Sequence, residues 1–262
     1  MSSSSENGDI ERLVRQLDAD TADAAMDAQA ELTHRGHTSD VVAPLLRALP
    51  TLTRYGQLCA IEIVEELDDQ RADEPLITLL DSEHDTVREW AAGALGRRQV
   101  HDAIPALRRS YQASLARHDR PDWSEPVGLR RALTDLGARN PVVPWLTASL
   151  QETIVDAWPA WPSTRIIDVL DDLANHGQVT LYFQLWRVEP DGQTYWVELP
   201  TDDTMLDFTQ PWPHVVAHAR NRAVNQARQA QLGEHIVAAI EWIDERDLAI
   251  APDSPAGNVQ ST

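Results

Sequence analysis

Apolar positions recur at helical spacing over much of the chain, and the pattern itself repeats. Three apolar helical segments carry a proline near their start, at Pro44, Pro75 and Pro105, which are 31 and then 30 residues apart. Proline suits a first helical turn because its missing N–H would have no partner there. A second apolar stretch follows the first two segments, at 59–64 and 90–95, again 31 residues apart. The pattern predicts stacked helix pairs.

Weaker copies of the pair extend the pattern in both directions. An earlier copy spans 10–17 and 24–32, and a later one spans 143–157 and 163–174. Each pair has an apolar face that it cannot bury alone, and stacking neighbours makes one continuous core. We therefore predict a mainly α fold, an α-solenoid of about four to five helix pairs over residues 9–175.

The clearest copies carry a specific order of residues. Residues 74–81 have a Pro-Leu pair and further leucines before an acidic turn. The next segment, 86–96, contains a Val-Arg pair, then small residues, and ends in Ala-Leu-Gly. The following repeat begins with Ala-Ile-Pro-Ala-Leu at 103–107. This order, best over about 41–111, resembles the short HEAT-like repeats first noted in phycobilisome lyases. The resemblance implies a curved surface that holds another macromolecule. It covers scaffolds, adaptors and regulatory subunits, and a minority of bilin lyases.

The repeat spacing lengthens once. Leu95 and Leu136 are equivalent by pattern but 41 residues apart, and the extra residues fall around 117–126, which includes Arg120 and Trp123. Insertions in repeat arrays map to loops on one face, often the binding face. Two interpretations remain: a charged, solvated turn with Trp123 folded back on the solenoid, or a loop that contacts a partner.

After His176 the pattern becomes that of strands. Residues 179–188 and 194–199 are predicted as strands, joined by a turn that contains Pro190 and Gly192.

Two helices are expected to follow the hairpin, at about 213–232 and 234–247. Residues 176–248 are therefore predicted as a small α+β region of a β-hairpin plus two helices. The two ends, 1–8 and 249–262, are rich in small and polar residues. We expect both ends to be disordered.

Charge changes the picture of the surroundings. The net charge is −20, and all 22 basic residues are Arg, with no Lys. An acidic chain can bind cationic partners, or it can belong to a very salty cytoplasm, where 1 M salt screens charges over about 3 Å. The even spread of carboxylates and the absence of Lys favour the halophilic interpretation. The same charge argues against nucleic-acid binding.

Location follows from what the sequence lacks. The Ser-rich start has no hydrophobic signal region, and no apolar run approaches 18 residues. We expect a cytoplasmic protein with no membrane partner.

No motif compels an enzyme. Neither a nucleophile elbow, a phosphate loop nor a dinucleotide fingerprint is present. The one cysteine, Cys59, lies in an apolar helical run and is expected to be buried. His214 and His218 have a spacing that can hold a metal, but the intervening residues lack the Glu of a zinc protease and no third ligand is evident. We predict no catalytic set, no cofactor and no metal.

Three Trp-Pro pairs, at 158–159, 161–162 and 212–213, leave two interpretations open. The aromatics either pack between the last helices and the hairpin or form a groove for a peptide or ligand.

The leading functional prediction is a non-catalytic protein–protein interaction scaffold or adaptor, and the alternative is a lyase-like or sensor protein with a small ligand in the Trp-rich C-terminal region. We expect the partner protein on the face formed by the second helices and the insertion. The candidate residues are Glu62, Glu65, Arg88, Arg131, Asp135, Arg120 and Trp123.

Overall fold

The computed structural model describes residues 3–38, 40–118, 120–139, 154–155, 158–199, 205–230, 232–233 and 235–249. The chain forms two compact units, the first ending at Arg139 and the second running from Asn140 to Ile250. Each unit has its own core, and each is described by itself.

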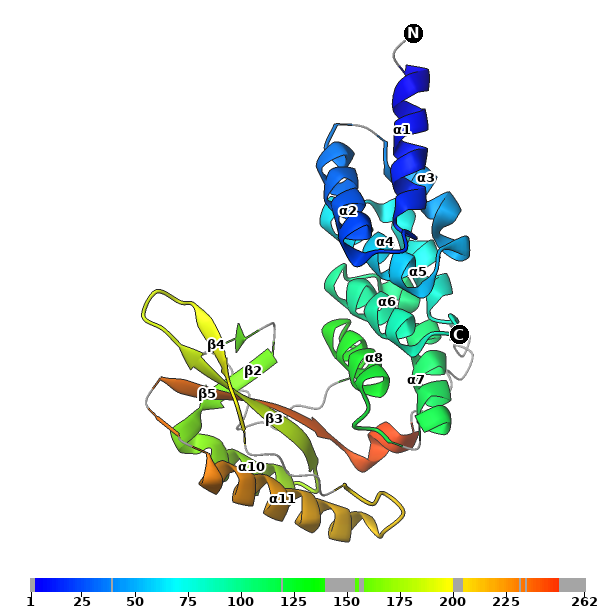
Figure 1. Cartoon of the computed structure of the whole chain (residues 1–262). Helices are drawn as coiled ribbons and strands as arrows, with labels where there is room; N and C mark the ends of the chain where they lie inside the picture. The colour runs from blue at the N-terminus through cyan, green and yellow to red at the C-terminus, as the bar shows by residue number, and fades with distance from the viewer. Residues whose placement is uncertain are drawn as a thin grey trace, which may run out of the picture. The chain divides into compact units, whose positions relative to one another are not determined.

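Unit 1 contains helix pairs stacked in chain order, which confirms the predicted solenoid (Figure 1). The second helices contact one another in succession, α2 with α4, α4 with α6, and α6 with α8. Within the described residues the pairs are α1 (Ser3–Gln16) with α2 (Ala22–Gly36), α3 (Val42–Ala48) with α4 (Arg54–Leu67), α5 (Asp73–Leu79) with α6 (Asp85–Arg97), and α7 (Ile104–His118) with α8 (Ser124–Asp135). Short 3₁₀ turns precede or follow the first helices at Leu49–Thr51 (η1), Gln70–Ala72 (η2) and His101–Ala103 (η3).

The prolines lie where the pattern placed them, in the first turns of α3, α5 and α7. The leucine that follows each of them, Leu45, Leu76 or Leu107, is fully buried. Small residues line the contact between second helices. A Cβ atom added to Gly96 on α6 would lie 3.0 Å from the Cα atom of Ala132 on α8, so these two helices touch through their backbones.

Most of the extra residues of the last repeat lengthen helix α7, and only a short connection remains of the loop that we expected around 117–126. Helix α7 has 15 residues, whereas α3 and α5 have 7 each. The added turns of α7 stay helical because they keep a buried stripe, with Tyr111 and Ser114 inaccessible to solvent. Only the short stretch from His118 to Ser124 connects α7 with α8.

The two predicted disordered ends have different outcomes. Helix α1 begins at Ser3, so most of the segment 1–8 is helical. This helix carries its own buried stripe, formed by Ile10, Leu13 and Val14, and Leu17 directly after its end is also buried. The predicted tail, 249–262, lies outside the described residues except for Ala249, which ends a 3₁₀ turn, η5 (Glu245–Ala249).

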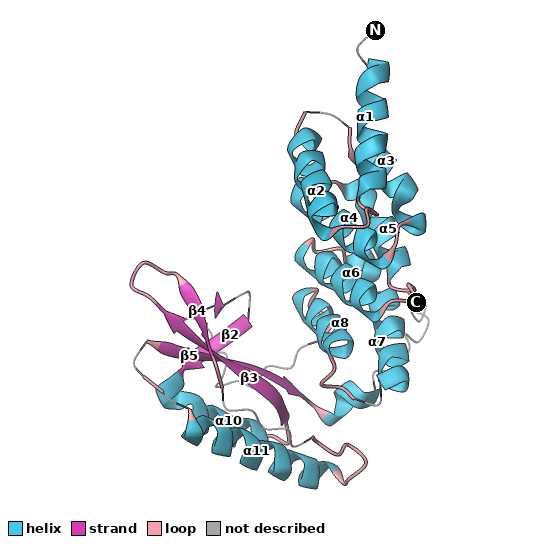
Figure 2. Ribbon diagram, in the orientation of Figure 1, coloured by secondary structure: helices cyan, strands magenta, loops and turns pink. Residues whose placement is uncertain are grey.

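Unit 2 is an antiparallel sheet with helices on one face (Figure 2). The strand order is β1 (Ile154–Val155), β2 (Trp158–Pro162), β5 (Ile236–Ile243), β3 (Val179–Val188) and β4 (Thr194–Val197). The predicted hairpin is β3–β4, with Leu185 opposite Val197 and Gly192 in the turn at φ 87°. Helices α10 (Ile166–Asn175) and α11 (Trp212–Gln229) pack on the sheet through Leu170, Val224 and Ile240 among others.

Two elements differ from the sequence prediction. The expected helix at 234–247 is strand β5, which pairs with β3 on one side and β2 on the other. Its central position buries both faces, and a short run that is apolar on both faces does not distinguish a strand from a helix. The segment 163–174, which we assigned to the solenoid, forms η4 (Ser163–Arg165) and most of α10 in the core of unit 2. The described solenoid therefore ends near Arg139 and not at 175. Of the expected helix at 143–157, residues 154–155 form β1, and the rest lies outside the described residues.

Candidate functional site

The second helices of unit 1 form an open groove of about 800 Å³, lined by residues of α2, α4 and α6. We call it the second-helix groove. Its apolar wall includes Met26 on α2, Tyr55 on α4 and Trp90 on α6, which are 56%, 41% and 37% exposed. Each comes from a different repeat, and all three are large apolar side chains left in contact with solvent. Repeat stacking thus gathers exposed apolar surface from residues far apart in the sequence.

The polar side of this groove is acidic. Glu62 and Glu66 are four residues apart on α4, and both line the groove. The Nε2 atom of Gln29, on α2, donates a hydrogen bond to the carboxylate of Glu62. His34 and His37, at the end of α2, also line the groove.

Cys59 lies at the base of the second-helix groove and is only 3% exposed, as predicted. Burial raises the pKa of its thiol, and the nearby charge of Glu62 raises it further. A thiol with a raised pKa stays protonated near neutral pH and is a weak nucleophile. Burial and the raised pKa therefore both disfavour covalent chemistry at this cysteine.

The structure places four of the predicted partner-binding residues in different surroundings. Glu62 lines the second-helix groove, whereas Glu65 pairs with Arg97 on α6, at 2.8 Å between Nη2 and Oε2. Arg131 and Asp135 both lie on α8, beyond the groove, and Asp135 is exposed.

The structure corrects the prediction that Arg88 lies on the exposed, partner-binding face of the second helices. Its side chain is 6% exposed, and its Nε and Nη2 atoms donate to Glu125 at 2.5 and 2.9 Å. Its Nη1 atom donates to the carbonyl oxygen of Ser82. All three of these donors are used inside the protein, so Arg88 is not available to a partner. It lies on the buried side of α6 because Glu125, at the start of α8, reaches it.

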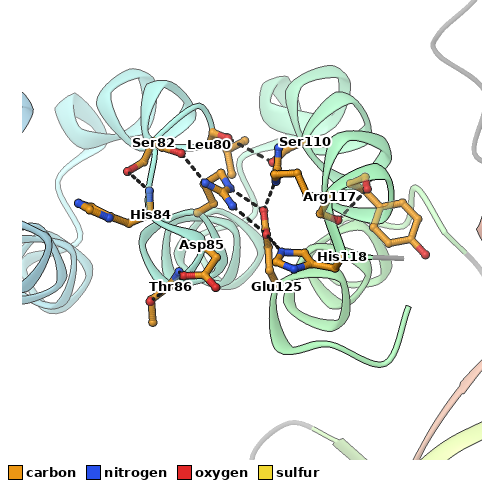
Figure 3. Close-up of polar contacts among 12 residues, drawn as sticks. Leu80, Ser82, His84, Asp85, Thr86, Ser110, Arg117, His118 and Glu125 are labelled. Atoms are coloured by element: carbon orange, nitrogen blue, oxygen red, sulfur yellow. Dashed lines mark hydrogen bonds and ion pairs between the residues drawn. The ribbon is translucent and has the colours of Figure 1, made fainter. Parts of the chain in front are cut away.

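Glu125 is the centre of a buried polar cluster (Figure 3). Its carboxylate is inaccessible to solvent, and it also accepts from Arg117 at 2.6 Å and lies 2.7 Å from His118 Nε2. Burial by itself would raise the pKa of Glu125, but the hydrogen bonds from Arg88, His118 and Arg117 outweigh it and hold this pKa below its ordinary value. The carboxylate is thus charged in the folded protein and joins α6, α7 and α8.

Trp123 and Arg120, the predicted insertion residues, pack against the end of α7. Arg120 pairs with Asp122 at 2.8 Å, and its guanidinium lies 5.5 Å from the centre of the Trp123 ring. The Trp123 ring stacks on His118 at 5.8 Å and remains 41% exposed. Trp123 is thus folded back on the end of α7, and whether its exposed part contacts a partner stays a prediction.

The Trp-Pro pairs of unit 2 do not form one aromatic groove among the side chains that the structure describes. Trp161 is buried in the core, with its ring 5.9 Å from that of Trp242. Trp212 begins α11 and donates its indole N–H to the carbonyl oxygen of Gly177 at 2.7 Å.

The described residues contain neither a cluster suited to a metal ion nor a helix that could span a membrane. His214 and His218 are exposed on α11, and the described part of the chain holds no group of three or more His, Cys, Asp or Glu placed to bind a metal ion. No helix in that part is both long enough and apolar enough to cross a bilayer.

Comparison with known proteins supports the repeat. Residues 42–120 match a family model described as HEAT repeats, and this range spans α3 to the end of α7. No curated protein matches the chain. The solenoid is therefore a HEAT-repeat structure over the range that also has the clearest sequence pattern.

Proposed function

We propose that unit 1 is a non-catalytic scaffold or adaptor that holds a segment of a partner protein in the second-helix groove. The observation that carries the proposal is the convergence of Met26, Tyr55 and Trp90 on one groove. Exposed apolar surface gathered in one place marks interaction sites, and aromatic side chains contribute strongly to binding. HEAT-type solenoids present extended surfaces that commonly serve as interaction scaffolds.

The groove also indicates the chemistry of the segment. Its apolar wall fits a large aliphatic or aromatic anchor, and Glu62 and Glu66 fit a basic or amide neighbour of that anchor. A bound segment that covers Met26 and Trp90 removes apolar area from water, which stabilises the complex by roughly 25 cal/mol per Å² of apolar area buried.

Site-specific photo-crosslinking tests the proposal. The photoreactive amino acid p-benzoylphenylalanine replaces Tyr55 in the groove or, as the matched control, Tyr195, which is 46% exposed in unit 2. We expect a crosslinked protein from native-salt host lysate only with the probe at position 55. Trp90→Ala in the same chain should abolish the crosslink, whereas Trp123→Ala, an exposed tryptophan outside the groove, should not. Equal crosslinking at both probe positions, or equal loss with both tryptophan variants, would refute a specific groove.

The alternative role, a lyase-like or sensor protein with a small ligand in the C-terminal region, has less support. Trp161 and Trp242, two of the aromatics that such a pocket would use, pack against each other in the core. Its test is optical, because a bound chromophore would colour the protein purified from its host, and a ligand at exposed Trp196 would quench tryptophan fluorescence.

A further inference from the structure

Helices α2 and α4 run in parallel, side by side. The side chain of Gln29 on α2 contacts Glu62 on α4. Gly36, the last residue of α2, lies against the side chain of Leu67, the last residue of α4. The second-helix groove follows this pair of helices, because its lining residues recur at helical spacing over 26–37 and over 55–66. At 1.5 Å per residue, the groove is roughly 16 Å long.

The character of the groove changes along its length. Met26, Tyr55 and Leu58 come from the first turns of the two lining stretches, and this part of the wall is apolar. Glu62 and Glu66 come from the later turns of α4, and both are exposed. An occupant that lies along the groove therefore meets apolar surface first and carboxylates one to two turns further on.

The negative charge in the groove is not neutralised from within the chain. Glu62 accepts a hydrogen bond from the neutral amide of Gln29, and Glu66 has no cationic partner among the described residues. The basic side chains of the described lining are His34 and His37, and the lining contains no arginine. The groove thus offers two carboxylates, one helical turn apart, to cationic groups of an occupant.

The walls of the groove favour a helical occupant. Both walls are α-helices, whose interior N–H and C=O groups are bonded within the helix. An extended segment laid against them would cover its own backbone polar groups without giving them partners, which costs free energy. A helix satisfies these groups itself and presents side chains to the groove.

Charge and aromatic surface together favour arginine on that helix. Side chains three or four residues apart lie one turn apart on a helix, so two such cations can reach Glu62 and Glu66 together. The C-terminal ends of α2 and α4 lie at the acidic end of the groove and add partial negative charge there. A guanidinium pairs with carboxylates in a planar fork and also stacks on aromatic rings such as those of Tyr55 and Trp90.

We propose that the second-helix groove binds an amphipathic helix of about three turns that carries two arginines, one turn apart, on the same face as its apolar residues. The apolar residues of this helix cover Met26, Tyr55 and Trp90, and its arginines pair with Glu62 and Glu66. The inference rests on the function proposed above and specifies the kind of segment that the partner protein supplies.

The test uses the full chain in native salt, with ¹³C-methyl methionine, and synthetic peptides as probes. Met26 is 56% exposed in the groove, whereas Met205 is 57% exposed in unit 2 and serves as the control signal in the same sample. The first peptide, acetyl-QAALAQALQARAQARQ-amide, has its two leucines and two arginines on one helical face. The second, acetyl-QAALAQALRAQARAQQ-amide, has the same composition with the arginines on the opposite face.

We expect the first peptide to shift the methyl signal of Met26 and to leave that of Met205 unchanged. The second peptide should bind about threefold to tenfold more weakly, because exposed ion pairs contribute little individually. A third peptide, in which proline replaces the alanine at position 7 of the first, should bind roughly tenfold more weakly or worse, because proline breaks the helix.

Variants of the protein assign the discrimination to the two carboxylates. Glu62→Gln combined with Glu66→Gln changes two exposed residues and should make the first and second peptides bind equally. Asp81→Asn combined with Glu83→Gln is the matched control, because it removes the same charge from exposed positions outside the groove. This control should preserve the difference between the peptides.

Four results would overturn the proposal. They are the absence of a Met26 shift at millimolar peptide, equal binding of the first two peptides to the unmodified protein, undiminished binding of the proline peptide, and a difference that persists when both Glu62 and Glu66 are replaced. If photo-crosslinking from position 55 still succeeds in such a case, only the basic helix is refuted and the scaffold function stands. Loss of the specific crosslink refutes both.

Discussion

Replacing Glu125 by glutamine tests how unit 1 is held together. The substitution keeps the shape and one acceptor oxygen but removes the negative charge and places an NH₂ group among donors. The Arg88 side chain, 6% exposed, then has no counter-charge. Arg117 and His118 lose the same partner, but their side chains are 41% and 21% exposed and can regain water. The loss is therefore dominated by Arg88.

Breaking a buried ion pair by removing one partner destabilises a protein by about 3 to 5 kcal/mol. Because Arg88 keeps its hydrogen bond to Ser82, we expect the lower end of this range, about 3 kcal/mol. Urea unfolding of the full chain, followed by circular dichroism at 222 nm, measures the change in free energy of unfolding. The matched control is Glu65→Gln, which breaks a pair with the half-exposed Arg97 and should cost about 0 to 1 kcal/mol.

A double variant separates charge from packing. Arg88→Met combined with Glu125→Leu removes both charges and keeps apolar bulk, so it should recover most of the stability lost by Glu125→Gln. A cost below about 1 kcal/mol for Glu125→Gln, equal to that of the control, would show that the cluster is hydrated and that the argument from burial is wrong.

Three further predictions follow from the same structure. Because the pKa of Glu125 is lowered in the folded state, its contribution to stability is present above the unfolded value near 4.5 and is lost as pH falls below that value. The urea midpoint should therefore drop between pH 6 and pH 3, and it should drop less in Glu125→Gln. An equal drop in both proteins would contradict this. Gly96→Ala should destabilise unit 1 by about 1 to 3 kcal/mol because the new methyl group meets the backbone of Ala132. Gly93→Ala on the same helix meets only the flexible end of Arg97, so it should be neutral or stabilising by up to about 1 kcal/mol. Thermal unfolding compares the two variants, and equal effects would refute the close contact. Lowering KCl from molar to below roughly 0.2 M should reduce helical circular dichroism because a net charge of −20 then repels over a longer Debye length; full structure in dilute buffer would contradict the halophilic interpretation.

Local sequence carried much of the solenoid prediction. Proline in the first turn, a buried leucine after it and small residues in the second helix recur at one spacing, and each has a local physical reason. The same spacing pointed to the second-helix face. It also relates Trp90 to Cys59, one repeat earlier. A sharper use of the repeat could therefore have found Trp90 as a residue of that face.

The errors came where neighbours in space decide the outcome. Residues 236–243 are apolar on both faces, and only pairing with β2 and β3 makes them a strand. Arg88 looked like a surface residue because arginine is usually exposed. It is buried because Glu125, 37 residues away, supplies its counter-charge, and no local pattern marks one useful carboxylate among 42 acidic residues.

The sequence by itself determined the repeat, the helix pairs over most of unit 1, the hairpin and the acidic surface. These depend on periodicity, on turn residues and on composition, all of which can be read from the sequence before the fold is known. The tertiary structure alone decided that α10 and β5 belong to the core of unit 2, that Arg88 is buried, and that Met26, Tyr55 and Trp90 meet in one groove. The physical reason is that burial and ion pairing are set by residues distant in sequence, so they are known only once the chain is packed.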